Sequence, residues 1–415
     1  MELKQKIYNL LRWSQKYTQT DMVYLAKGGF WLTLEQIISI VSGFLLAIAF
    51  ANLLPKETYG TYRYVLSLAS ILAIPTLSGM NTAIVRAVAR GYEGSFIPAL
   101  KTKLRWGILT TLASLGLAGY YFFHENITLT FCFLIVAAFL PSMRSFTLYS
   151  SFWQGRKRFD IKTKYGFISQ IVAVSTLVIA LFLTKNLFLI LSVYFISHTL
   201  LYFIFLQITI KKSNLNQKHD PQTISYGKHL SLMGIIGIVT NQLDKLLLWH
   251  FLGAAPVAIY SFAVLPPAKI KATLQTIGGL ALPKFSQRSK QELKTTLPKK
   301  IFKLFLLIIP IIVLYIIFAP FIYKIIFPQY LDSVIYSQVF VFFLIVTIPT
   351  TLLSTSFLAQ MKKKELYIYQ TVSPIIQIIL LLTLVPLYGI WGAIFALLIT
   401  RFSNLGLLLF LFKRM

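Results

Sequence analysis

The stretch "NQLDKLLLWHFLGA", residues 241–254, places an aspartate beside a lysine inside a run that otherwise has the composition of a membrane span. Of the 415 residues in the chain, 57% are hydrophobic and 13% are charged. A soluble globular protein carries about twice that share of charge. The composition therefore indicates an integral membrane protein. In such a protein Asp244 and Lys245 must face protein or water, because a lone charge facing lipid costs about 2.5–3.5 kcal/mol.

Apolar runs of helical length recur along the whole chain. Each can cross a hydrocarbon layer of about 30 Å, and together they predict about twelve helices. We expect them at roughly 28–53, 63–85, 106–123, 129–150, 166–184, 188–210, 229–252, 259–283, 301–323, 334–360, 367–386 and 389–412.

The positive charges test this count. About 32 of the 40 Lys and Arg residues lie in the N-terminal segment, the even-numbered connections and the C-terminal tail, and cytoplasmic loops are where such charge collects. The odd-numbered connections hold only Lys56, Arg63, Lys185 and Lys324. The alternation predicts that both termini are cytoplasmic.

The polar stretch near the centre of the chain predicts two lobes. We expect an amphipathic N-terminal cytoplasmic segment at 1–27, a six-helix N-lobe at 28–210, a cytoplasmic linker at 211–228 and a six-helix C-lobe at 229–415. A short repeat supports this division, because "LPKETYGTY" and "LGAAPVAIY" each follow the first helix of their lobe. Parallel repeats of this kind frame a central site in transporters.

Several functional classes are excluded by what the sequence lacks. It contains no P-loop, no nucleophile elbow and no cluster of His, Cys, Asp or Glu with metal-ligand spacing, so we predict no cofactor, no metal and no enzymatic activity. Cys132 is the only cysteine, which excludes an intrachain disulfide. The net charge of +28 lies mostly in short connections between spans, so it indicates topology and not a nucleic-acid partner.

Polar residues share one side of the predicted helix at 229–252. Asn241, Asp244 and Lys245 fall at helical offsets of three and four from one another or from Thr240. Two interpretations are open. Asp244 and Lys245 either neutralise partners on neighbouring helices or line an aqueous cavity.

Further cations lie in the spans that follow. In "VLPPAKIKATLQT" the pair Pro266 and Pro267 is predicted to break the helix and to act as a hinge, and Lys269 and Lys271 follow at once. Arg401 adds a cation in the last span, whereas Glu35 and Asp244 are the only acids near mid-span. A net positive interior suits an anionic cargo such as phosphate. Snorkelling of these cations to an interface is the alternative.

Five stretches resemble the Wzx-type polysaccharide flippases of the multidrug/oligosaccharidyl-lipid/polysaccharide (MOP) superfamily. They are "FANLLPKETYGTYRYVLSLASIL" from 50, "GMNTAIVRAVA" from 79, "FWQGRKRFD" from 152, "NQLDKLLLWHFLGAAPVAIYSFA" from 241 and "VPLYGIWGAIFA" from 385. The resemblance implies an all-α, MATE-like, V-shaped fold that works by alternating access. It also implies a bacterial cytoplasmic (inner) membrane location and a lipid-linked oligosaccharide cargo on a polyprenyl diphosphate carrier, such as an O-antigen repeat unit. Its partners would be membrane lipids and polysaccharide polymerase or assembly proteins.

This interpretation gives the charged residues roles. Lys245, Lys269, Lys271 and Arg401 would bind phosphate, Asn241 and Asp244 would orient sugar, and Glu35 or Asp244 would carry a coupling ion. Two alternatives stay open. One is a cation-coupled multidrug exporter of the same fold. The other is a membrane-embedded glycan polymerase or ligase, for which the outer loops are short.

Overall fold

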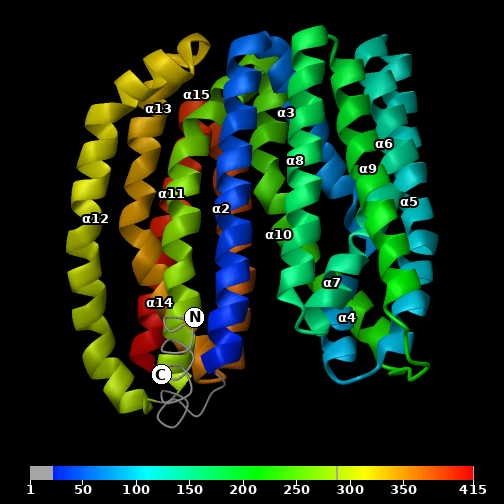
Figure 1. The fold of residues 1–415 in the computed structure, drawn as a ribbon. Coiled ribbons are helices and arrows are strands. Elements are labelled where there is room, and N and C mark those ends of the chain that lie inside the picture. The colour runs from blue at the N-terminus through cyan, green and yellow to red at the C-terminus, as the bar shows by residue number, and fades with distance from the viewer. Residues whose placement is uncertain (1–21, 287, 415) are drawn as a thin grey trace, which may run out of the picture. The chain divides into compact units, whose positions relative to one another are not determined.

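The computed structural model describes residues 22–286 and 288–414, and the predicted amphipathic segment at 1–27 lies largely outside this part of the chain. The described elements are helical (Figure 1). Among them, nine helices are long and apolar enough to cross a membrane, or up to ten if the bent pair Lys56–Leu72 and Ile74–Ala89 forms one span. The prediction of an all-α membrane fold is therefore confirmed. Twelve spans and cytoplasmic termini remain predictions.

The chain divides into two compact units, and one segment from the first half of the sequence belongs to the second unit. Among the described residues, unit 1 holds 22–49 and 72–235, and unit 2 holds 50–71, 236–286 and 288–414. Residues 50–71 therefore belong with the second half of the chain, although they lie in the first half of the sequence. The four predicted segments, with lobes at 28–210 and 229–415, stay a prediction.

Unit 1 is a bundle with its own apolar core. Its elements are α2 (Met22–Leu53, up to Ala49), η1 (Ile74–Thr76), α4 (Gly79–Ala89), η2 (Glu93–Ser95), α5 (Phe96–Phe123), α6 (Ile127–Phe146), α7 (Leu148–Gly155), α8 (Phe159–Leu183), α9 (Leu187–Lys212) and the start of α10 (Thr223–Leu252). Helices α5, α6, α9 and α8 pack in succession (Figure 1). The core includes Met80, Phe96, Phe152 and Trp153.

The central linker is tied to unit 1 by hydrogen bonds. Arg156 of the "FWQGRKRFD" stretch makes a bidentate pair with Glu93, at 2.6 and 2.7 Å, and also donates to the Ser213 carbonyl oxygen at 2.5 Å. The Gly94 N–H donates to the Lys218 carbonyl oxygen at 3.0 Å. A planar guanidinium can hold a carboxylate and a carbonyl at once, so one arginine fixes the linker to the end of α7.

Unit 2 packs around a second core. Besides 50–71 with α3 (Lys56–Leu72) and the rest of α10, it contains α11 (Ala254–Ser286), α12 (Lys290–Ile326), η3 (Pro328–Tyr330), α13 (Ser333–Phe340), η4 (Val341–Phe343), α14 (Leu344–Ala359) and α15 (Lys363–Arg414). Helix α11 contacts α13 and α14, and α12 packs along the same pair (Figure 1). Gly389 has φ +56° and ψ −126°, so α15 is two helices joined at a kink.

The two stretches of the sequence repeat pack against each other inside unit 2. A Cβ on Gly60 would lie 1.8 Å from the Ala254 carbonyl oxygen, so the start of α3 approaches the start of α11 more closely than any side chain allows. Tyr59 and Phe262 have ring centroids 4.8 Å apart, and Tyr64 stacks on Trp249 at 4.2 Å. These contacts explain why residues 50–71 belong to unit 2.

The Gly60 contact predicts a steep steric penalty. Gly60→Ala should destabilise the protein by about 1–3 kcal/mol or more, because its Cβ meets backbone that cannot rotate away. Gly237→Ala on α10 is the matched control, since its Cβ meets nothing within 4 Å. Thermal unfolding of the purified variants in detergent measures the difference. Equal melting temperatures for the two variants would contradict the close approach.

The predicted topology can be tested with the single cysteine. In a Cys132→Ser background, Lys185→Cys between α8 and α9 should react with a membrane-impermeant thiol reagent on intact cells. Lys218→Cys in the linker should react only after the cells are opened, because the loops rich in Lys and Arg stay in the cytoplasm. Both lysines are exposed, so access to the reagent is decided by the membrane. Labelling of position 218 on intact cells would show that the orientation is the opposite of the predicted one.

Candidate functional site

The charges of Asp244 and Lys245 neutralise each other within unit 2. The Lys245 Nζ lies 3.2 Å from Asp244 Oδ1, and the same oxygen accepts the Lys245 backbone N–H at 2.8 Å. The Tyr260 hydroxyl of α11 donates to Asp244 Oδ2 at 2.5 Å. Each side chain of the pair is only 10% exposed. Of the two interpretations of these charges, the geometry favours neutralisation, with the acid satisfied by its neighbour and by one adjacent helix.

The predicted polar stripe on α10 does not share one environment. Thr240, Asp244 and Lys245 are buried, whereas Asn241 is exposed. The Thr240 carbonyl accepts a hydrogen bond from Gln377 at 3.4 Å. Asn241 is thus accessible, and its proposed contact with sugar stays a prediction.

Two of the predicted cations approach each other in unit 2. Lys271 of α11 and Arg401 of α15 are partly buried and lie within electrostatic range of each other. Arg401 is also within range of Tyr260 and Tyr369. Lys269 is two residues from Lys271, about 200° around the helix, so the two lysines cannot face the same partner.

In the part of the chain that the structure describes, no acidic side chain forms an ion pair with these cations. Among the ion pairs of residues 22–286 and 288–414, none includes Lys269, Lys271 or Arg401. Lys271 lies near the middle of the 33-residue helix α11, and Arg401 lies within the second part of α15. Like charges that are partly buried repel and lose hydration, so this pair favours water or an anion beside it.

The predicted helix break at Pro266 and Pro267 is wrong. Helix α11 continues as an α-helix from Ala254 to Ser286 through both prolines. Prolines in membrane helices are tolerated where neighbouring groups satisfy the freed carbonyls. A hinge at this pair stays a prediction.

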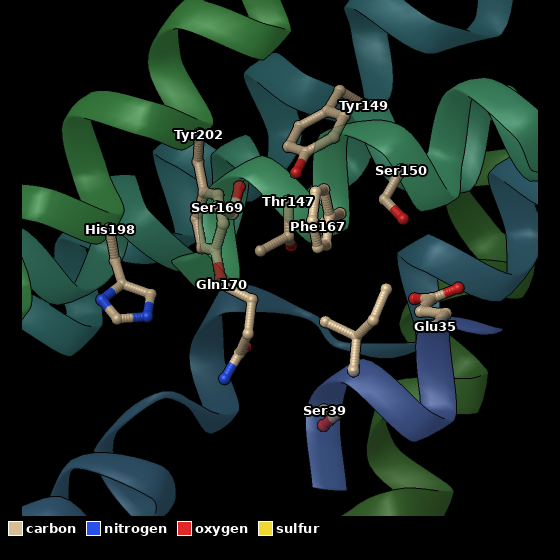
Figure 2. Close-up of a pocket in the computed structure, with 12 residues that line it drawn as sticks. Glu35, Ser39, Thr147, Tyr149, Ser150, Phe167, Ser169, Gln170, His198 and Tyr202 are labelled. Carbon is tan, nitrogen blue, oxygen red and sulfur yellow. The ribbon is translucent and has the colours of Figure 1, made fainter. Parts of the chain in front are cut away.

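Unit 1 contains a polar cavity of about 260 Å³ that the sequence did not reveal (Figure 2). Four helical segments contribute to it. Its polar lining includes Glu35 and Ser39 of α2, Ser150 of α7, Gln170 of α8, and His198 and Tyr202 of α9. The α6–α7 junction at Thr147 also lines it, and there the helix is interrupted within the candidate span Ile127–Gly155. Irregular backbone at membrane depth is tolerated only against protein or water, which fits a polar cavity.

The acid of this cavity is paired. Glu35 Oε2 lies 3.3 Å from the Nζ of Lys162 at the start of α8. The His198 Nδ1 lies 2.8 Å from the Tyr194 carbonyl oxygen. Because a carbonyl can only accept, Nδ1 carries the proton, and the Nε2 of a neutral ring is left as an acceptor.

Sequence reasoning found Glu35 but missed its partner and the cavity around it. Lys162 had the appearance of one more cation in a cytoplasmic connection. His198 and Gln170 were the available signals, because each interrupts a long apolar run.

Unit 1 also buries Lys103, which is 1% exposed and donates to Asn81 Oδ1 at 2.9 Å.

Comparison with solved structures identifies the fold. The structure resembles an outward-facing multidrug resistance MATE family transporter of the MOP superfamily (TM-score 0.63, 14% identity, 94% of this chain and 95% of that chain). It also resembles the lipid II flippase MurJ in an inward closed conformation (TM-score 0.67, 14% identity, 92% and 87%). A third similar structure is a MOP superfamily transporter from Pyrococcus furiosus described as having a binding pocket of reverse polarity (TM-score 0.62, 14% identity, 93% and 96%). The chain therefore shares the fold of these multi-pass membrane proteins.

The sequence places it more closely. The family described as "Polysaccharide biosynthesis protein" matches residues 25–289, and the chain belongs to this family. It is also 23% identical over 409 residues to MJ1068, an uncharacterized membrane protein of Methanocaldococcus jannaschii, covering 88% of this chain and 80% of that protein.

The closed Asp244 network predicts an asymmetric response to substitution. Asp244→Ala should cost about 3–5 kcal/mol of stability, because it leaves Lys245 buried without a counter-charge. The double variant Asp244→Leu with Lys245→Met removes both charges and should recover most of that loss. Thermal unfolding in detergent, followed by tryptophan fluorescence, compares the two. A single variant as stable as the parent would show that the pair is hydrated and not locked.

Proposed function

We propose that the protein is a flippase that moves polyprenyl-diphosphate-linked oligosaccharide across the cytoplasmic membrane by alternating access. Membership in the polysaccharide biosynthesis family and the MOP-superfamily fold support this proposal. No bond need be made or broken, so the protein acts as a transporter and not as an enzyme. The cargo comes from the cytoplasmic face of a bacterial inner membrane, and polymerase or assembly proteins receive it.

One observation carries the proposal. Lys271 and Arg401 are partly buried, lie within electrostatic range of each other and make no ion pair with an acid among the described residues. A diphosphate supplies the missing negative charge, and its contacts with Lys and Arg are strong where water is scarce. The isoprenoid tail stays in the lipid while the headgroup crosses, which spares the phosphates the cost of entering hydrocarbon.

The roles of the other predicted residues follow from this geometry. Lys269 faces another direction from Lys271 and contacts a second part of the cargo, and Asn241 is exposed enough to reach sugar. Lys245 and Asp244 support the site indirectly, because they neutralise each other. Glu35 is the better candidate for ion coupling, because a proton or cation that binds its carboxylate can replace the ion pair with Lys162.

A multidrug exporter is less well supported. Export of cationic drugs favours an unpaired acid in the membrane, and both mid-span acids here are paired with lysines.

The proposal predicts a loss of flipping without loss of folding. The double variant Lys271→Ala with Arg401→Ala, reconstituted in liposomes, should flip a fluorescent undecaprenyl-diphosphate oligosaccharide at least about tenfold more slowly, because the phosphate loses its partners. The matched control is Lys185→Ala with Lys324→Ala, which removes two cations predicted to lie outside. Full flipping activity in a folded double variant at 271 and 401 would overturn the assignment.

A further inference from the structure

The cavity of unit 1 has a chemistry different from that of the cations in unit 2. Among the described residues that line it there is one acid, Glu35, whose charge is balanced by Lys162, and no lysine or arginine. A phosphate there would lie beside a carboxylate and would meet no free cation. The cavity therefore does not suit the diphosphate of the proposed cargo.

The lining of the cavity suits a neutral ligand rich in hydroxyl groups. Among the described residues, the Gln170 carboxamide and the hydroxyls of Ser39 and Ser150 make no side-chain hydrogen bond with protein, and His198 Nε2 is left as an acceptor. They present both donors and acceptors. An acyl chain in this space would leave these groups without partners, at about 1–3 kcal/mol for each one buried.

Apolar faces complete the lining. Phe167 borders the same space as the rings of Tyr149 and Tyr202 (Figure 2). Ile38 also lines the cavity. A pyranose has C–H groups on its faces and hydroxyls around its rim, so it can pack on aromatic rings and bond polar groups at its edge. At about 260 Å³ the cavity falls below the range of about 300–1,000 Å³ that is usual for drug-sized ligands, which favours one small ring.

We propose that this cavity is a sugar-binding subsite that takes one monosaccharide unit of the cargo. This inference rests on the proposed function. The cavity recognises the glycan through Gln170, His198, Ser150 and the aromatic faces.

Gly166 offers a way to close the subsite without removing any polar group. It lines the cavity, and a Cβ built on it meets only Glu35 Oε1, at 3.8 Å. The side chain of Gly166→Leu would therefore grow into the cavity and occupy the space of a ring. Gly116→Leu is the matched control, because Gly116 is an exposed glycine of α5 whose Cβ meets nothing within 4 Å.

The experiment measures binding to the full-length protein in nanodiscs by native mass spectrometry. The probes are undecaprenyl diphosphate and the same lipid carrying one glucose, one galactose or one N-acetylglucosamine. We expect at least one glycosylated probe to bind about tenfold more tightly than the bare lipid. Gly166→Leu and Gln170→Ala should abolish that preference and leave binding of the bare lipid unchanged. Gly116→Leu should retain the preference.

The outcomes separate this inference from the proposed function. Equal binding of all four probes by the parent protein, or an unchanged preference in both Gly166→Leu and Gln170→Ala, would overturn the subsite while leaving the flippase intact. Failure of the parent to bind any probe, the bare lipid included, would overturn both.

Discussion

A charge inside the hydrocarbon layer must find an opposite charge, a set of hydrogen bonds or water, because no other source of solvation exists there. Unit 2 meets this constraint in two ways. Asp244, Lys245 and Tyr260 satisfy one another and are buried together. Lys271 and Arg401 carry the same sign and cannot do so, and they have no acid beside them in the part of the chain that the structure describes. The first arrangement stabilises the fold, and the second leaves a requirement that an anionic ligand can meet.

The two units thus differ in kind. Unit 1 offers a nearly neutral, hydroxyl-rich and aromatic space, and unit 2 offers partly buried cations. The proposed cargo of sugar and diphosphate contains both chemistries. Structures described as a multidrug resistance transporter and a lipid II flippase have the same fold at 14% identity. Side chains inside the fold, and not the fold itself, decide what is carried.

Physical rules that act locally made some features predictable and left others out of reach. The apolar period and length of runs such as Leu187–Lys212 predicted helices, because lipid permits little else. The rule for proline, applied locally, predicted a break in α11 that the helix does not have. Proline is tolerated in a membrane helix where neighbouring groups satisfy the freed backbone carbonyls, and the local rule leaves this out. The repeated tyrosine turns were visible in the sequence, but the close approach of Gly60 to Ala254 was not.

The sequence by itself determined the membrane class, the helical architecture and the family, since composition, span length and short motifs are read along one dimension. Only the tertiary structure decided which charges are paired. It joined Glu35 to Lys162 across 127 residues of chain, paired Asp244 with Tyr260, and formed the cavity from four helical segments. The reason is that an ion pair or a cavity depends on distances of a few ångströms between helices, and the spacing of residues along a single helix does not contain those distances.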